Sequence, residues 1–98
     1  MAATLEDRIL ERATVEQRIR QFPGWTFDGK ILMRVFDFGS FPDAIHFVNR
    51  VAEAAEKLDH HPDFVIHYKR VTLTCSTHKH HAITEADLAL LKEIEELV

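Results

Sequence analysis

Residues 71–78 alternate between apolar and polar side chains, and this pattern constrains the fold more than any other segment. One set comprises Val71, Leu73, Cys75 and Thr77, and the other comprises Thr72, Thr74, Ser76 and His78. Side chains two positions apart on a β-strand lie on the same face, so the strand has one apolar face and one face of hydroxyl groups. A strand of this kind is typical of an antiparallel sheet that is covered on one side only.

Two capping signatures predict the start of a short helix near each end of the chain. Thr14 is followed three residues later by Gln17. Thr84 is followed by Asp87 at the same spacing. In a capping box the hydroxyl accepts a hydrogen bond from the backbone of the later residue, whose side chain bonds back. We therefore expect helices that begin at Thr14 and Thr84, the first of which ends at Pro23-Gly24.

A longer helix is predicted between Ser40 and Asp59. Ser40 is a favourable cap, and Asp43 occupies the reciprocal capping position. Apolar side chains recur at helical spacing and predict a buried stripe of Ile45, Val48, Val51, Ala52, Ala55 and Leu58. The helix is expected to end near Asp59, because Pro62 disfavours helical geometry in the residue before it.

Three further strands complete the predicted sheet. Residues 25–27 and 31–38 flank Asp28-Gly29, a dipeptide typical of a tight hairpin turn, and residues 64–68 precede the alternating segment. The element order is thus α-β-β-α-β-β-α, an α+β fold with a four-stranded antiparallel sheet and three helices packed on one face. We predict a single domain over residues 1–98, with residues 1–12 as an N-terminal extension of one or two helical turns.

The second predicted strand is apolar on both of its faces. Leu32, Phe36 and Phe38 lie on one side, and Ile31, Met33 and Val35 lie on the other. Helices that pack on one face of the sheet would cover only one of these sets. We therefore expect a subunit interface to cover the second face.

The composition gives no indication of nucleic-acid or membrane binding. Lys and Arg number 12 against 16 Asp and Glu, a net charge of −4, whereas such binding requires a basic patch. No apolar run approaches the ~20 residues that span a bilayer, and the charged residues 5–12 do not resemble a secretory signal. The single Cys75 excludes an internal disulfide and fits a reducing compartment, so a cytoplasmic protein is expected.

Seven of the 98 residues are His, and three of them are predicted to converge. His60 and His61 stand in the passage from the long helix to the third strand, and His78 stands at the end of the fourth strand. Antiparallel pairing of these two strands brings His78 back beside the histidine pair. Imidazole donates and accepts protons near neutral pH, so the cluster is suited to acid–base chemistry.

The histidines form part of a longer pattern. Its members are Glu56, His60-His61-Pro62, Tyr68, His78 and Asp87, in the order and spacing typical of pterin-4a-carbinolamine dehydratases. Further matches are Pro23-Gly24-Trp25, Arg34-Val35-Phe36-Asp37-Phe38, Phe41 and Val51-Ala52-Glu53. The chain therefore resembles this family over roughly residues 14–98. The fold of the family is the one predicted above.

The resemblance implies a dehydratase that removes water from 4a-hydroxytetrahydropterin to give quinonoid dihydropterin. This reaction recycles the tetrahydrobiopterin cofactor of aromatic amino acid hydroxylases. The implied catalytic groups are His60, His61 and His78, and no metal, nucleotide or other cofactor is expected. We expect His61 and His78 to transfer protons and His60 to contact the leaving hydroxyl. The implied substrate-binding residues are Asp59, Ser76, Thr77 and Lys79.

The chain departs from the family pattern directly after His78. The family usually has an acidic residue and then a glycine-containing turn there, whereas this chain has Lys79-His80-His81. Lys79 reverses the expected charge, and the missing glycine removes an easy route to positive φ. The family is typically a tetramer built as a dimer of dimers, so the resemblance implies a homo-oligomer.

Several of these residues also have structural interpretations that need no function. The capping box explains Asp87, an exposed helix surface explains Glu56, and packing explains Tyr68. A solvated turn explains His80 and His81.

Two other functions stay open at this point. The first is a metal site, whose ligands would be His60, His61, His78 and either His80 or His81. The sequence lacks two features typical of such sites, a pair of His ligands at helical spacing and an accompanying set of Cys ligands. The second is a non-catalytic interaction protein on the same fold, because relatives of this family serve as dimerisation cofactors or as assembly factors for a carbon-fixing enzyme. Degenerate members of that kind are expected to lose the three histidines, and this chain keeps them.

Overall fold

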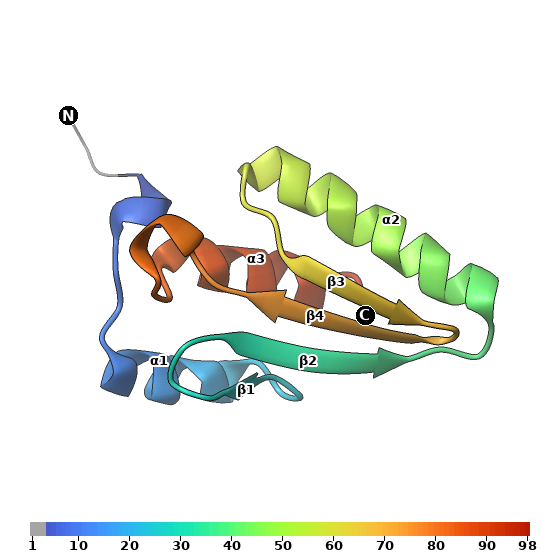
Figure 1. The fold of residues 1–98 in the computed structure, drawn as a ribbon, viewed down its shortest axis with the longest axis horizontal. Helices are drawn as coiled ribbons and strands as arrows, with labels where there is room; N and C mark the ends of the chain where they lie inside the picture. Colours follow the sequence, from blue (N-terminus) through green and yellow to red (C-terminus); the bar gives the residue numbers. More distant parts are fainter. Residues whose placement is uncertain (1–3) are drawn as a thin grey trace.

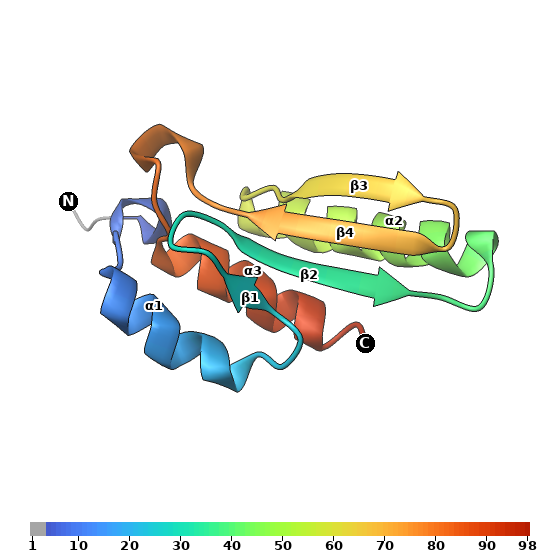
Figure 2. The same ribbon diagram turned by 60° about the horizontal axis from the view of Figure 1, so that its bottom comes forward.

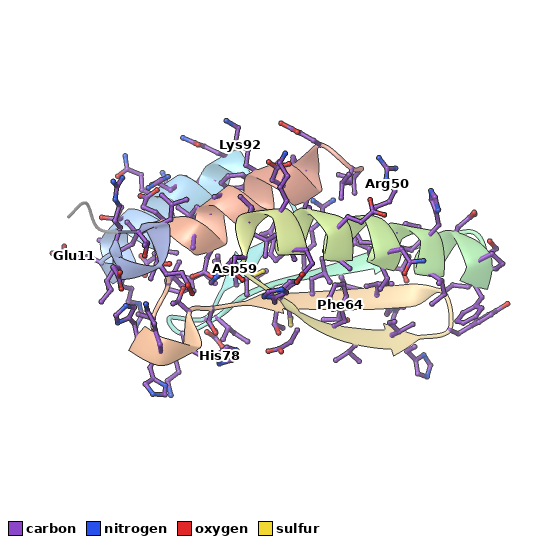
Figure 3. The ribbon with its side chains drawn as sticks, turned by 90° about the horizontal axis from the view of Figure 1, so that it is seen from above. Glu11, Arg50, Asp59, Phe64, His78 and Lys92 are labelled. Carbon is purple, nitrogen blue, oxygen red and sulfur yellow. The ribbon has the colours of Figure 1, made fainter. Side chains whose placement is uncertain are left out.

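Helices cover only one face of a four-stranded antiparallel sheet in the computed structural model, which describes residues 4–98 (Figures 1 and 3). The strands are β1 (Thr26–Phe27), β2 (Leu32–Asp37), β3 (Asp63–His67) and β4 (Arg70–Cys75), and their order in the sheet is β1-β2-β4-β3. The helices are α1 (Arg12–Arg18), α2 (Phe41–Leu58) and α3 (Glu85–Glu95). Three short 3₁₀ turns are η1 (Leu5–Asp7), η2 (Ile19–Gln21) and η3 (His78–His80). The predicted fold class and element order are confirmed.

Strand β4 lies inside the sheet, between β2 and β3, which accounts for its alternating sequence. Val71, Leu73 and Cys75 are buried beneath the helices, and Leu73 pairs with Arg34 on one side and Phe64 on the other. The strand ends at Cys75, earlier than the predicted end at His78. Beyond it, the chain folds back on itself, because Thr77 forms a bridge with Ala82 across the η3 turn.

Helix α2 begins and ends where its sequence predicts. The Ser40 hydroxyl accepts a hydrogen bond from the Asp43 amide at 3.2 Å. The helix stops at Leu58 because Asp59 adopts a left-handed conformation with φ 51°. Its buried side chains are Ala44, Phe47, Val51 and Ala55, and the predicted Ile45, Val48 and Leu58 are half-buried. The prediction that Ala52 belongs to the buried stripe is wrong, because Ala52 is turned about 100° from Val51 and is exposed.

Helix α1 begins at Arg12, two residues before the predicted cap at Thr14. No side chain caps this helix, and its cap residue is Glu11. The preceding segment is instead tied to the start of α3, because the Leu10 amide donates to the Ile83 carbonyl at 2.9 Å. This tertiary contact sets where the helix begins, and local capping chemistry does not. The predicted helical extension is a single 3₁₀ turn, η1, and residues 1–3 of that prediction lie outside the described residues.

The turn between β1 and β2 is longer than the predicted two-residue hairpin. Asp28 Oδ1 accepts hydrogen bonds from the backbone amides of Lys30 and Ile31 at 2.8 and 2.9 Å. Gly29 occupies the next position with φ 98°, a conformation that favours glycine. Because Ile31 belongs to this turn, β2 begins at Leu32 instead of Ile31.

No helix of residues 4–98 lies over the opposite face of the sheet (Figure 3). Val35 pairs with Thr72, which pairs with Val65, so these side chains form a row across three strands on that face. Val35 is 44% exposed and Val65 is 61% exposed. The predicted second apolar face of β2 is therefore present and uncovered within this chain. No helix in residues 4–98 has the length and apolar character needed to cross a membrane.

Candidate functional site

Three segments that are distant in the sequence meet at one end of the molecule (Figure 1). They are η1, the turn from α2 into β3, and the segment from the end of β4 through η3. A cavity of about 200 Å³ lies among them. Its lining consists of Glu6, Asp59, His60, His61, Ser76, His78 and Lys79. The predicted convergence of His60, His61 and His78 is therefore confirmed, and Figure 3 shows Asp59 and His78 at the same end of the sheet.

His60 is the buried member of the three histidines. Its side chain is 6% exposed, and its backbone amide donates to the Ala55 carbonyl at 3.0 Å. The left-handed Asp59 turns the chain back towards the helix end and so places this amide. The ring Nε2 lies 2.6 Å from Oδ1 of Asp87, and Nδ1 lies 3.6 Å from Oε1 of Glu6.

Asp87 connects the helix cap to the site. Its side chain is fully buried, and Oδ2 accepts hydrogen bonds from the Thr84 amide at 2.9 Å and from the Thr77 hydroxyl at 2.8 Å. The predicted capping box of Thr84 and Asp87 is confirmed. Oδ1 remains free of the cap and accepts from His60. One carboxylate therefore both stabilises α3 and holds a histidine of the site.

The contact with Asp87 favours the charged form of His60. The hydrogen bond to Asp87 raises the pKa of His60, the charges of Asp87 and Glu6 act in the same direction, and burial opposes them. The raised pKa means that the attraction of the carboxylates exceeds the cost of desolvation. Both ring nitrogens face carboxylates, an arrangement that suits an imidazolium with two N–H donors.

His61 and His78 are exposed, in contrast to His60. The side chain of His61 is 54% exposed, and its Nε2 lies 2.5 Å from Oε2 of Glu56 on the last turn of α2. The side chain of His78 is 75% exposed, and its Nε2 lies 3.7 Å from Oδ2 of Asp63. Glu56 is thus paired with a histidine of the site, although its own side chain is open to solvent. Both exposed rings can reach a ligand and exchange protons with water.

The predicted substrate-binding residues divide into two groups. Asp59, Ser76 and Lys79 line the cavity. Thr77 does not line it, because its side chain is buried and its hydroxyl is bonded to both Thr84 and Asp87. Thr77 therefore helps to hold Asp87, the buried hydrogen-bond partner of His60.

The other residues of the sequence pattern have structural places. Pro62 is buried at the start of β3. Tyr68 is exposed in the turn between β3 and β4, where it stacks on Phe41 with ring centroids 6.5 Å apart. That turn lies at the far end of the sheet from η3 (Figure 2). Tyr68 is therefore remote from the histidines.

The Lys79-His80-His81 turn is held by an acidic residue from the N-terminal segment. Lys79 Nζ and His80 Nε2 both lie 3.1 Å from Oδ1 of Asp7. The hydrogen bonds from His80 and then Lys79 lower the pKa of Asp7 to about 2. His81 adopts φ 49°, so the turn reaches the left-handed region without a glycine. Such a conformation costs a non-glycine residue about 1 kcal/mol.

A second cavity adjoins the first beneath η1. It has a volume of about 330 Å³ and is lined by Thr4, Leu5, Glu6, Asp7, Leu58, Asp59, His60, Lys79, Ala86 and Ala89. Glu6, Asp59, His60 and Lys79 line both cavities. The part played by Glu6 and Asp7 was missed in the sequence, because no local pattern links them to residues more than fifty positions away.

The histidine cluster does not form a metal site in this structure. Among residues 4–98, no group of three or more His, Cys, Asp or Glu side chains is arranged to hold a metal ion. The ring nitrogens face carboxylates in separate pairs instead of a shared centre.

The sequence matches a family model described as pterin 4 alpha carbinolamine dehydratase over residues 8–97. The chain belongs to this family. The match includes the three histidines, Glu56 and Asp87, and it begins after Glu6 and Asp7.

Curated relatives extend over almost the whole chain. A protein of Thermomicrobium roseum named "Putative pterin-4-alpha-carbinolamine dehydratase" is 46% identical over 88 residues, which are 90% of this chain and 95% of the relative. A protein of Roseiflexus castenholzii with the same name is 41% identical over 98 residues, the full length of both chains.

Two solved structures share the fold. The crystal structure of a transcriptional coactivator/pterin dehydratase from Brucella melitensis has a TM-score of 0.84 at 33% identity, and covers 93% of this chain and 98% of its own. A pterin dehydratase-like protein identified as a RuBisCO assembly factor in the alpha-carboxysome has a TM-score of 0.61 at 22% identity, and covers 74% of this chain and 84% of its own. The second likeness shows the fold alone.

Proposed function

We propose that the protein catalyses the loss of water from a 4a-hydroxytetrahydropterin, which yields a quinonoid dihydropterin. One observation supports this proposal above all. Three imidazoles from two segments, the turn after α2 and η3, surround one cavity, and they include one that is buried beside carboxylates and two that are exposed. Family membership supports the same reaction.

The reaction needs one proton donor and one proton acceptor. The bond between C4a and the hydroxyl oxygen breaks, the oxygen takes a proton from an acid, and a ring nitrogen gives a proton to a base. No electron is gained or lost overall, so the histidines suffice without a redox partner. In our proposal His61 and His78 transfer the protons, since both are open to water. His60 contacts the leaving hydroxyl through Nδ1, because Oε1 of Glu6 lies 3.6 Å from this nitrogen, beyond hydrogen-bond distance. Its Nε2 is already engaged by Asp87.

Direct substrate binding is proposed for three residues that line the cavity, Asp59, Ser76 and Lys79. Asp59 and Ser76 offer oxygen atoms that accept hydrogen bonds from the N–H groups of a pterin ring. Lys79 offers an ammonium group to the carbonyl end of the ring. Thr77 acts indirectly, through its hydrogen bond to Asp87.

Stopped-flow measurement of the dehydration of a chemically generated 4a-hydroxypterin tests the proposal. We expect the protein to accelerate the reaction over buffer, and His61→Ala and His78→Ala each to lower the rate by about 10²–10⁴-fold. His46→Ala is the matched control, because His46 is an exposed histidine on α2 that does not line either cavity. A wild-type rate equal to that of buffer, or full activity in both site variants, contradicts the proposal.

The biological setting belongs to the same proposal. The reaction would recycle tetrahydrobiopterin for an aromatic amino acid hydroxylase in the cytoplasm. We also propose a homo-oligomer, a dimer or a dimer of dimers, because Met33, Val35 and Val65 leave an apolar face of the sheet uncovered. Light scattering at micromolar concentration tests this, and a stable monomer contradicts it. Val35→Asp is expected to shift the equilibrium towards smaller species.

A second candidate is a non-catalytic interaction role on the same fold. It is favoured by the likeness to the Brucella protein, which is described as a transcriptional coactivator as well as a pterin dehydratase, and by the uncovered sheet face. The stopped-flow measurement separates the two candidates, since an interaction role alone predicts a dehydration rate that does not depend on His61 or His78.

A further inference from the structure

The segment before α1 is docked on the site by its backbone. The Arg8 carbonyl accepts a hydrogen bond from the Glu85 amide at 3.1 Å, and the Leu10 amide donates to the Ile83 carbonyl at 2.9 Å. Ile9 forms an antiparallel bridge with Thr84. The chain therefore leaves η1 as a short extended segment against the start of α3, beside the cap that contains Asp87.

Side chains hold the other edge of η1. Asp7 contacts both Lys79 and His80 of η3, and its Oδ2 accepts a hydrogen bond from the Thr4 hydroxyl at 2.9 Å. The turn is thus attached to α3 on one side and to η3 on the other. It forms a wall of both cavities, and this attachment determines where Glu6 points.

Glu6 faces the one ring nitrogen of His60 that Asp87 leaves free. Its Oε1 lies 3.6 Å from Nδ1, while Asp87 occupies Nε2. The ionisable groups around His60 come from three elements and the adjoining turn. They are Glu6 of η1, Asp87 of α3, His78 and Lys79 of η3, and the neighbouring Asp59 and His61. Three of these six groups are acids, and Lys79 is already paired with Asp7.

We infer that Glu6 is a positioning residue for His60, which orients the ring towards the cavity and stabilises its protonated form. The inference rests on the proposed function, because it gives Glu6 a part in the same dehydration. It makes the N-terminal turn a component of the site, although the family match begins at residue 8. Glu6 acts through the imidazole and itself neither donates nor accepts the proton of the reaction.

A pair of charge-matched variants tests the inference. Glu6→Gln keeps the size of the side chain and removes its charge, and Glu11→Gln removes the same charge from an exposed residue that does not line either cavity. The ring resonances of His60 are followed by NMR as the pH is varied. We expect the titration midpoint of His60, the pH at which half of its rings are protonated, to fall in Glu6→Gln and to stay at the wild-type value in Glu11→Gln.

The pH profile of dehydration provides the second measurement. A site that needs His60 in its protonated form loses activity as the pH rises, which gives the rate profile an alkaline limb. A lower titration midpoint of His60 moves this limb to lower pH. We expect the alkaline limb to move in Glu6→Gln and not in Glu11→Gln, in variants that both remain folded. The same His60 midpoint in the two variants, or an unmoved limb, overturns the inference. The NMR titration needs no substrate, so a wild-type protein without dehydratase activity overturns the proposed function separately.

Discussion

The histidine site has a buried half and an exposed half, and the two are built in different ways. In the buried half, His60 is bonded to Asp87 and has Glu6 3.6 Å from its other ring nitrogen, and Asp87 is itself bonded within the cap of α3. In the exposed half, His61 and His78 each face a single carboxylate that is open to water. The same side chain is therefore part of the fold in one half and a surface group in the other.

An acid–base site needs both a fixed group and a group with access to water, and the two halves supply one each. A group that orients a substrate must not move, and burial with a satisfied hydrogen bond provides that rigidity. A group that exchanges protons must reach water, and exposure provides that access. A change in the buried half is therefore expected to affect both stability and chemistry, whereas a change in the exposed half is expected to affect chemistry alone.

Removal of Asp87 should have the largest effect on stability. Asp87→Ala leaves the Thr77 hydroxyl, the Thr84 amide and the ring of His60 without their acceptor in the interior. We expect a loss of about 3 kcal/mol in the free energy of unfolding, measured by urea denaturation. Ser40→Ala, which removes an exposed cap from α2, is the control and should cost about 1 kcal/mol. Equal losses would show that the buried half is no more integral to the fold than a surface cap.

Substitution of the histidines compares the two halves directly. His60→Gln removes the hydrogen-bonded ring from a buried position, and we expect a loss of about 1–2 kcal/mol in the free energy of unfolding. His61→Gln changes an exposed ring, and the expected change lies within about 0.5 kcal/mol. Denaturation curves of the two variants at one pH provide the measurement. A larger loss for His61→Gln would reverse the comparison.

The pH dependence of stability should report on the buried half. The pKa of His60 is raised in the folded protein, chiefly by the hydrogen bond to Asp87. Its contribution is complete below the unfolded value of about 6.5 and is lost as the pH rises through the higher folded value. We therefore expect the free energy of unfolding to decrease as the pH rises above about 6.5, and this decrease to be smaller in His60→Gln. An identical slope in wild type and variant would contradict the raised pKa.

The pair between Asp7 and Lys79 should matter least to global stability. Both side chains are largely exposed, and exposed ion pairs contribute about 0–1 kcal/mol. We expect Lys79→Gln to change the free energy of unfolding by less than about 0.5 kcal/mol. Hydrogen exchange at residues 5–9 should nevertheless become faster, because the turn loses one of its attachments. Unchanged exchange would mean that the backbone contacts to α3 hold the turn unaided.

The sequence allowed the fold to be predicted wherever local chemistry decides the structure. The alternation of Val71, Leu73 and Cys75 located the central strand, and the caps at Ser40 and Thr84 located two helices. The cap at Thr14 was predicted wrongly, because contacts between Leu10 and Ile83 set the start of α1. A local signal is overridden when distant residues compete for the same backbone groups.

The candidate site was predictable in part for a similar reason. Strand pairing alone brought His78 beside His60 and His61. The interpretation of Asp87 as a cap was correct but incomplete. A capping pattern accounts for Oδ2, which accepts from the Thr84 amide, and gives no sign that Oδ1 bonds to His60. Glu6 could not be found, because its partner lies in a segment to which no periodicity or motif connects it.

The buried Cys75 has a practical consequence for the study of this molecule. It is the only cysteine of the chain, it is 1% exposed, and burial raises the pKa of its thiol. A thiol in this state does not react with alkylating reagents until β4 separates from its neighbours. The rate of labelling in native buffer therefore measures how often that strand opens. Because the chain runs directly from Cys75 through Ser76 to His78, the same reagent reports how firmly the strand that delivers this histidine is held.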